Sequence, residues 1–145
     1  MKMKNTIIND WKTAFKNKDL VKKSALEAIK AKILLAEKSG QFELPLTDEQ
    51  IQNIISKEIK EIQDSMQYYS KDNINYINFT YKINVLEEYL PKQLTEDEVI
   101  NIVKKIIGDN PDEKNRGKLI GLTVKEIGNK FDKSKIAGIV NKVLL

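Results

Sequence analysis

The segment Val85–Val99 constrains the fold most strongly, because within it one helix has to end and another has to begin. Pro91 has no backbone donor and pushes Leu90 out of the helical backbone region. Thr95 precedes Glu98 by three positions, the spacing of a capping box that satisfies free amides at a helix start. The segment therefore predicts a helix end, a short linker and a new helix, and it divides the chain into domains at 1–90 and 91–145.

Apolar residues recur at helical spacing along the whole chain, with only three prolines and six glycines. This pattern predicts an all-α protein with about four helices in the N-terminal domain and three in the C-terminal domain. The run from Ile74 to Tyr89 also fits an alternating strand, but no second strand candidate exists to pair with it, so we interpret it as a helix. The expected helices cover residues 6–16, 20–38, 48–69, 74–89, 96–107, 113–127 and 133–144, with Gly108 closing the fifth. Besides Thr95, the expected N-terminal caps are Asn5 or Thr6, Asp19, Thr47 and Asp132.

The 145 residues include no cysteine and no histidine. Disulfides, thiolate or imidazole catalysis, and zinc sites built on sulfur or imidazole are therefore excluded. No loop has the alternating Asp/Asn pattern of a calcium site, and no glycine-rich phosphate loop is present. Glu96, Asp97 and Glu98 are explained by their place in the first turn of a helix. We predict no metal, no cofactor and no catalytic residue.

No apolar run has the length of a membrane span. The first residues lead directly into an amphipathic pattern that contains Asp10 and Trp11, without the apolar region of a secretory signal. We therefore expect a cytoplasmic protein with no membrane partner. Its oligomeric state does not follow from the sequence.

The net charge of +4 is unevenly distributed. Residues 1–38 carry +6, residues 39–90 carry −5, and residues 114–145 carry seven lysines and Arg116 against Glu126 and Asp132. A basic tail of this kind is typical of a protein that binds a polyanion. The competing interpretation is that these lysines form a solvated helix face.

The candidate site lies in this basic tail. Gly117 and Gly121 are about one helical turn apart, and two glycines inside a helix indicate that a neighbouring helix or a ligand such as a phosphate approaches the backbone. Lysines around the 128–132 connection would suit the phosphates of a folded RNA, and Phe131 is either a base-stacking residue or a core residue. The candidate nucleic-acid-binding residues are Arg116, Gly117, Lys118, Gly121, Lys125, Lys130, Lys133 and Lys135.

Two motifs occur in a distinctive order and separation. The first is the junction Leu86–Thr95, which contains Leu-Pro-Lys-Gln-Leu, and the second is Arg116–Gly121, Arg-Gly-Lys-Leu-Ile-Gly. With Lys16-Asn17-Lys18-Asp19, Lys60 and Asp64-Ser65, they make the chain resemble the YqeY family over essentially its whole length. The connection between the last two expected helices, called here the corner, reads Asn129-Lys130-Phe131-Asp132-Lys133. It departs from the family pattern, in which residues 129 and 133 are glycines.

The resemblance implies an all-helical protein whose C-terminal domain is similar to the tail of the B subunit of the tRNA-dependent amidotransferase. That tail helps to hold tRNA, and it also occurs fused to some glutaminyl-tRNA synthetases. The expected function is a non-catalytic accessory protein that binds tRNA or a tRNA-handling protein complex. Two alternatives are a protein-interaction module with an acidic docking segment at 43–72, and, by family association, a carbon–nitrogen ligase with glutamine as amido-N-donor.

Overall fold

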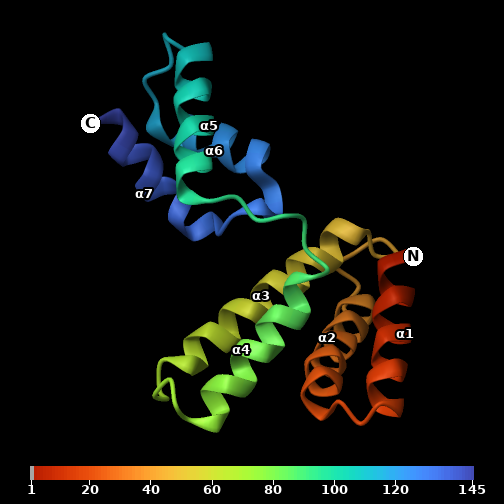
Figure 1. Ribbon diagram of the computed structural model, residues 1–145. Coiled ribbons are helices and arrows are strands. Elements are labelled where there is room, and N and C mark those ends of the chain that lie inside the picture. Colours follow the sequence, from red (N-terminus) through yellow and green to blue (C-terminus); the bar gives the residue numbers. More distant parts are fainter. Residues whose placement is uncertain (1) are drawn as a thin grey trace. The chain divides into compact units, whose positions relative to one another are not determined.

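The computed structural model describes residues 2–145, which form seven α-helices and one short 3-10 turn with no strand among them (Figure 1). The prediction of an all-α protein is confirmed. The chain divides into two compact units, Met1–Leu90 and Pro91–Leu145, called here the N-terminal unit and the C-terminal unit. That each unit is a domain able to fold by itself stays a prediction.

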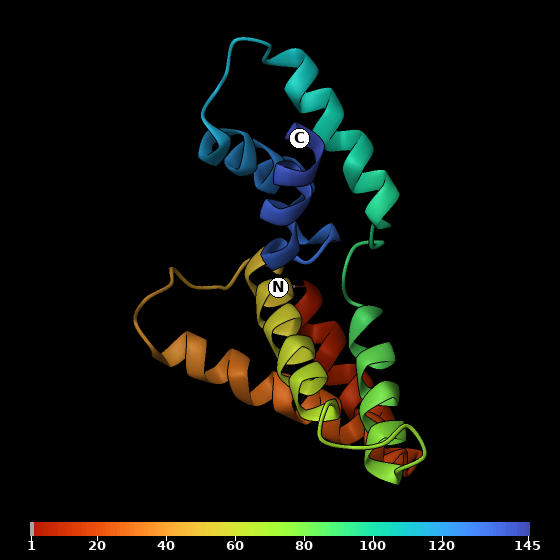
Figure 2. The ribbon, with the colours of Figure 1, turned by 90° about the vertical axis from the view of Figure 1, so that its left-hand side faces the viewer.

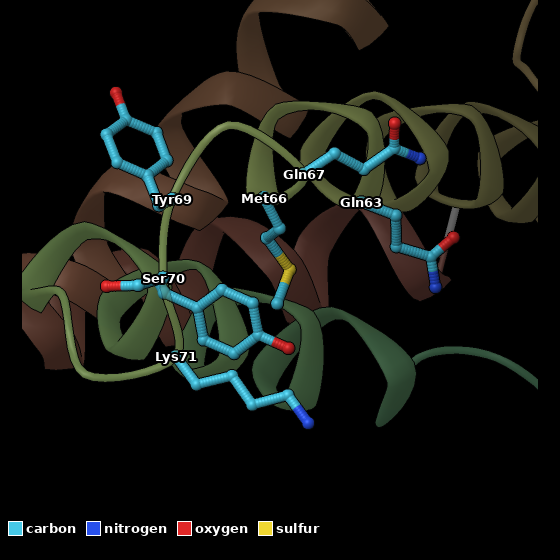
Figure 3. A pocket seen from close by; sticks show the side chains of 7 residues that line it. Gln63, Met66, Gln67, Tyr69, Ser70 and Lys71 are labelled. Carbon is cyan, nitrogen blue, oxygen red and sulfur yellow. The ribbon is translucent and has the colours of Figure 1, made fainter.

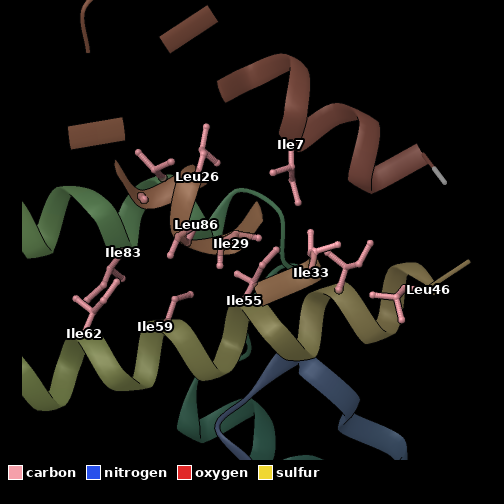
Figure 4. Packing of buried hydrophobic residues seen from close by; sticks show 13 residues of the cluster. Ile7, Leu26, Ile29, Ile33, Leu46, Ile55, Ile59, Ile62, Ile83 and Leu86 are labelled. Carbon is pink, nitrogen blue, oxygen red and sulfur yellow. The ribbon is translucent and has the colours of Figure 1, made fainter. Parts of the chain in front are cut away.

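The N-terminal unit contains four helices: α1 (Lys2–Lys16), α2 (Leu20–Lys38), α3 (Asp48–Met66) and α4 (Ile74–Glu87). Helix α2 packs against the other three, and an extended loop joins it to α3 (Figure 2). Figure 4 shows how all four helices direct isoleucine and leucine side chains into one core. The fully buried members of this core are Ile7, Leu26, Ile29, Leu46, Ile51, Ile55 and Leu86.

Local capping fixes where α2 and α3 begin. The Asp19 carboxylate accepts the Lys22 amide at 3.2 Å, and Thr47 forms a reciprocal capping box with Gln50 at 3.1 and 2.9 Å. Both starts agree with the predictions. The predicted end of α3 is wrong, because the helix stops at Met66 and the chain continues to Tyr69 in i to i−3 turns.

Helix α1 begins at Lys2, earlier than the predicted start near Thr6. The added turn brings Met3 against the core on the same side as Ile7, and the Met3 amide donates to Asp48 Oδ1 at 3.4 Å. Both contacts involve residues distant in sequence. A local cap at Asn5 or Thr6 therefore does not decide where this helix starts.

Helix α4 confirms the helical interpretation of the ambiguous run, and only part of its apolar residues face the core. Ile74, Ile77 and Tyr81 are 64, 51 and 43% exposed, whereas Val85 and Leu86 are buried. The core contacts of α4 come from its later turns and from Phe79. The first half of the helix therefore presents apolar side chains to solvent.

The C-terminal unit consists of α5 (Glu96–Asp109), α6 (Arg116–Ile127), a 3-10 turn η1 (Gly128–Lys130) and α7 (Lys133–Leu144). Each of the three helices packs against the other two. Their shared core contains Val99, Val103, Leu119, Ile127, Ile136, Ile139 and Val140. The buried hydroxyl of Thr123 also lies inside the unit and donates to the Leu119 carbonyl at 2.9 Å.

Two boundaries in this unit differ from the predictions. Helix α5 runs through Gly108 to Asp109, so Gly108 does not close it. Helix α6 begins at Arg116 rather than Glu113, because the Asn115 side chain caps it by accepting the Lys118 amide at 3.3 Å. The predicted caps at Thr95 and Asp132 are confirmed: Thr95 accepts the Glu98 amide at 3.2 Å, and Asp132 accepts the Ser134 amide at 3.0 Å.

None of the helices formed by residues 2–145 combines the length and the apolar character needed to cross a bilayer.

Candidate nucleic-acid interface

One face of α6 carries three of the predicted site residues. At roughly 100° per residue, Lys118, Gly121 and Lys125 fall within about 60° of one another. All three are exposed, and they lie opposite the buried side chains of Leu119, Thr123 and Ile127. The helix therefore presents two ammonium groups on either side of a stretch of backbone that bears no side chain.

The backbone at Gly121 is open. A Cβ atom built at this position would meet nothing within 4 Å in the described part of the chain. Packing against a neighbouring helix therefore does not explain this glycine, and close approach of a ligand stays a prediction. At Gly117 an added Cβ would lie 3.2 Å from the Asn115 Oδ1 atom that caps the helix, so this glycine serves the cap.

Lys118 has an acidic neighbour. Its Nζ lies 3.2 Å from Glu113 Oε2, and Glu113 also accepts the Asn115 amide at 3.0 Å. The Asn115 amide and then Lys118 hold the pKa of the Glu113 carboxyl below its usual range. The Lys118 side chain is 66% exposed, so this ion pair is weak, and a phosphate group can compete for the same ammonium.

Arg116 points in a different direction from the rest of the set. Its Nη1 donates to Asn141 Oδ1 of α7 at 3.3 Å, and its position on α6 lies on the side of Leu119 and Ile127 rather than that of Lys118 and Lys125. The predicted residues on α6 thus divide between an open face and the seam with α7.

The corner between α6 and α7 carries the other three lysines: Lys130, Lys133 and Lys135. All three are exposed. The corner is held by the segment that precedes α5, because the Leu94 amide donates to the Lys130 carbonyl at 2.7 Å and Gln93 Nε2 donates to the Asn129 carbonyl at 2.9 Å. These bonds fix the backbone from which the lysines project.

The turn itself is made by Gly128, whose φ of +58° is accessible to glycine at little cost. Asn129, where the family pattern has a glycine, follows in the 3-10 turn and has no positive φ. The family's glycine at that position is therefore not needed for the turn in this chain. Phe131 is partly buried and packs against the core, which makes it a core residue rather than a stacking platform.

Charge in this region is largely uncompensated. Within residues 2–145, Lys118 forms an ion pair, whereas the other five cations of the predicted set have no carboxylate within 4.0 Å. The same residues contain no group of three or more acidic side chains arranged to hold a metal ion. The cations of this surface are suited to bind an anion that carries several charges.

Sequence reasoning missed three residues of this surface. Gln93 and Asn141 are partners of the corner and of Arg116, and Lys142 lies exposed about two turns after Lys135 on the same side of α7. The i, i+7 spacing could have identified Lys142. Gln93 stands within the Leu-Pro-Lys-Gln-Leu motif, but its bond to residue 129 spans 36 positions and has no local signature.

A separate hollow of about 450 Å³ opens on the N-terminal unit where α3 turns into α4. Figure 3 shows Gln63, Met66 and Lys71 at its wall, with the Tyr69 ring pointing away from Met66. The hollow is wide open to solvent and has no ionisable pair or acidic cluster among its lining residues. It offers an apolar contact surface rather than an enclosed ligand site.

Residues 4–144, nearly the whole chain, match the model of the YqeY family, described as Yqey-like protein. The chain belongs to the YqeY-like family. Among curated protein sequences, no relative matches this YqeY-like chain. Family membership confirms the resemblance noted from the junction and the Arg-Gly-Lys-Leu-Ile-Gly element, and it assigns no activity.

Proposed function

We propose that this YqeY-like chain is a non-catalytic accessory protein that binds tRNA, or a complex that handles tRNA, through the helices of its C-terminal unit. The observation that carries the proposal is the open face of α6, where Lys118 and Lys125 flank the bare backbone at Gly121. Two ammonium groups beside an unobstructed backbone suit a phosphate chain that passes close to the helix. The resemblance of this unit to the tail of the amidotransferase B subunit selects tRNA among polyanions.

The other lysines extend the same surface. Lys130, Lys133 and Lys135 project from a corner whose backbone is bonded to residues 93 and 94, so their Cα positions are fixed before any ligand arrives. Preorganised cations lose less conformational freedom on binding than flexible ones. Arg116 has a different role in this proposal: its bond to Asn141 ties α6 to α7 and orients the face.

The proposal is tested by measuring tRNA binding to the Lys118→Gln/Lys125→Gln/Lys130→Gln variant across a salt series. Each lost phosphate contact lowers the log–log salt slope by about one, so a reduction of about two to three is expected. The control removes three exposed lysines elsewhere, Lys57→Gln/Lys60→Gln/Lys71→Gln, at equal net charge. If the two variants bind tRNA equally well, the site assignment is wrong.

The apolar surface of the N-terminal unit supports a second candidate, a protein-interaction module. Tyr68 and Ile74 are 87 and 64% exposed beside the hollow lined by Met66 and Tyr76. Exposed apolar side chains next to a hollow are typical of a docking surface. A pull-down after nuclease treatment tests this candidate: partners lost from a Tyr68→Ser/Ile74→Ser variant support it, and partners found only with intact RNA contradict it.

A further inference from the structure

We infer that the N-terminal unit carries a second RNA-binding surface, formed by lysines of α1 and α2 around Trp11 and Phe15. This inference rests on the proposed binding of RNA and assigns part of it to a unit that the resemblance leaves without a role. Helices α1 and α2 run side by side here (Figure 1).

Two aromatic rings on α1 hold two ammonium groups from α2. Lys30 Nζ lies 3.5 Å from the centroid of the Trp11 ring, and Lys23 Nζ lies 4.8 Å from that of Phe15. The two rings are themselves neighbours, with centroids 5.8 Å apart. A cation over a ring face is attracted by the ring quadrupole, which restricts the positions of these ammonium groups.

Further lysines surround this pair. Lys12 and Lys16 lie about one turn apart on the exposed side of α1, next to Phe15, and Lys18 follows in the turn before α2. Phe15 remains 58% exposed and Leu20, the first residue of α2, is 71% exposed. The surface therefore combines a row of cations with accessible apolar groups.

Three of the four acids in this part of the chain are engaged by other groups. Residues 1–38 contain ten lysines and four acids. The Asp10 carboxylate accepts the Tyr89 hydroxyl, and Asp19 accepts the Tyr81 hydroxyl at 2.7 Å besides capping α2. Glu37 pairs with Lys4 at 2.7 Å, which leaves Glu27 as the acid nearest Lys23 and Lys30 along α2.

Folded RNA is the polyanion that this arrangement suits best. Its phosphates match a row of cations without carboxylate partners, and its unpaired bases can contact the exposed Phe15 side chain. Because Phe15 and Leu20 are also accessible, an anionic membrane is the competing ligand, and binding to anionic vesicles distinguishes it from RNA.

The test uses the full chain and total tRNA. In the Lys12→Gln/Lys16→Gln/Lys23→Gln variant we expect the log–log salt slope to fall by about two to three and the affinity at fixed low salt to fall about tenfold or more. Lys12→Arg/Lys16→Arg/Lys23→Arg should retain binding, and Glu27→Gln should strengthen it. The matched control is Lys38→Gln/Lys57→Gln/Lys60→Gln, which loses the same charge from exposed positions elsewhere in the unit.

Because Lys23 contacts Phe15, the double variant Lys12→Gln/Lys16→Gln, which alters only exposed side chains, repeats the test without disturbing the ring pair. Equal binding by the triple variant and its control overturns the inference. A variant that loses binding to anionic vesicles but keeps its tRNA slope also overturns it.

Measuring the Lys118→Gln/Lys125→Gln/Lys130→Gln variant, called here the C-terminal variant, in parallel separates the two proposals. Loss of salt slope only in the C-terminal variant contradicts the second surface and supports the C-terminal site. Loss of salt slope only in the Lys12→Gln/Lys16→Gln/Lys23→Gln variant supports the second surface and contradicts the C-terminal site.

Discussion

Among single residues, Gly121 is the position where one substitution should change the free energy of unfolding and tRNA affinity in opposite directions. An added Cβ meets no atom within 4 Å, so Gly121→Ala should raise the free energy of unfolding by about 0.5–1 kcal/mol, since alanine restricts the unfolded chain and favours the helix. If RNA approaches this backbone, the same change should weaken tRNA binding. Chemical denaturation and tRNA titration measure the two effects.

Gly108→Ala is the control for Gly121→Ala. It is equally unobstructed, but it lies in α5, which carries none of the proposed contact residues. It should leave tRNA affinity unchanged. If Gly121→Ala binds tRNA as tightly as the unmodified chain, RNA does not approach the backbone closely at this residue.

Tyr89 provides a pH-dependent prediction. Burial, and then its hydrogen bond to Asp10, raise the pKa of the Tyr89 hydroxyl above its usual value near 10. The folded state therefore keeps a proton that the unfolded state releases, so this contribution is fully present below pH 10 and is lost progressively as the pH rises further. Between pH 9 and 11, chemical denaturation should show that the free energy of unfolding falls more steeply for the unmodified chain than for Tyr89→Phe.

At neutral pH, Tyr89→Phe should lower the free energy of unfolding by about 1 kcal/mol, because a part-buried hydrogen bond to a carboxylate is lost. Tyr81→Phe is the matched comparison, since Tyr81 donates to Asp19 at the surface and its pKa is also raised by that bond. Tyr81→Phe should lower the free energy of unfolding by less than Tyr89→Phe does. If the free energy of unfolding depends on pH in the same way in Tyr89→Phe and the unmodified chain, the stabilising role given to the Tyr89 proton is wrong.

At the scale of helices, the two capping boxes allow each unit to be perturbed separately. Thr47→Ala removes the cap of α3 and Thr95→Ala that of α5, and each should cost about 1 kcal/mol. The single tryptophan, Trp11, lies in the N-terminal unit, so its fluorescence reports on that unit, whereas circular dichroism reports on both. Thr95→Ala should change the dichroism transition and leave the fluorescence transition in place.

The same helices show which features the sequence could predict. Caps at Asp19, Thr47, Thr95 and Asp132 were predicted correctly because each depends on residues two or three positions apart. The start of α1 and the outward side of α4 were missed, because contacts with distant residues decide them.

The candidate site likewise has features that the sequence predicts and features that only tertiary packing decides. The shared face of Lys118, Gly121 and Lys125 follows from helical periodicity alone. Tertiary packing decides the contact of Arg116 with Asn141 and the hydrogen bonds from residues 93 and 94 to the corner. No spacing in the sequence predicts these contacts.

At the level of the whole molecule, we propose that the two units are domains and that each contributes cations to RNA binding. Each unit has its own closed core, and the chain passes from one to the other at Pro91. If the units fold independently, Thr47→Ala should shift the fluorescence transition while the dichroism signal of the C-terminal unit persists. A single transition that moves as a whole in both cap variants would contradict independent domains.

Binding of tRNA is tested most directly by titrating the full chain with total tRNA over a salt series, beside duplex DNA of equal charge. We expect tighter binding to tRNA and a log–log salt slope of about five or more, because both surfaces would contact phosphates. No binding to tRNA at low salt, or equal binding to tRNA and duplex DNA, would contradict this expectation.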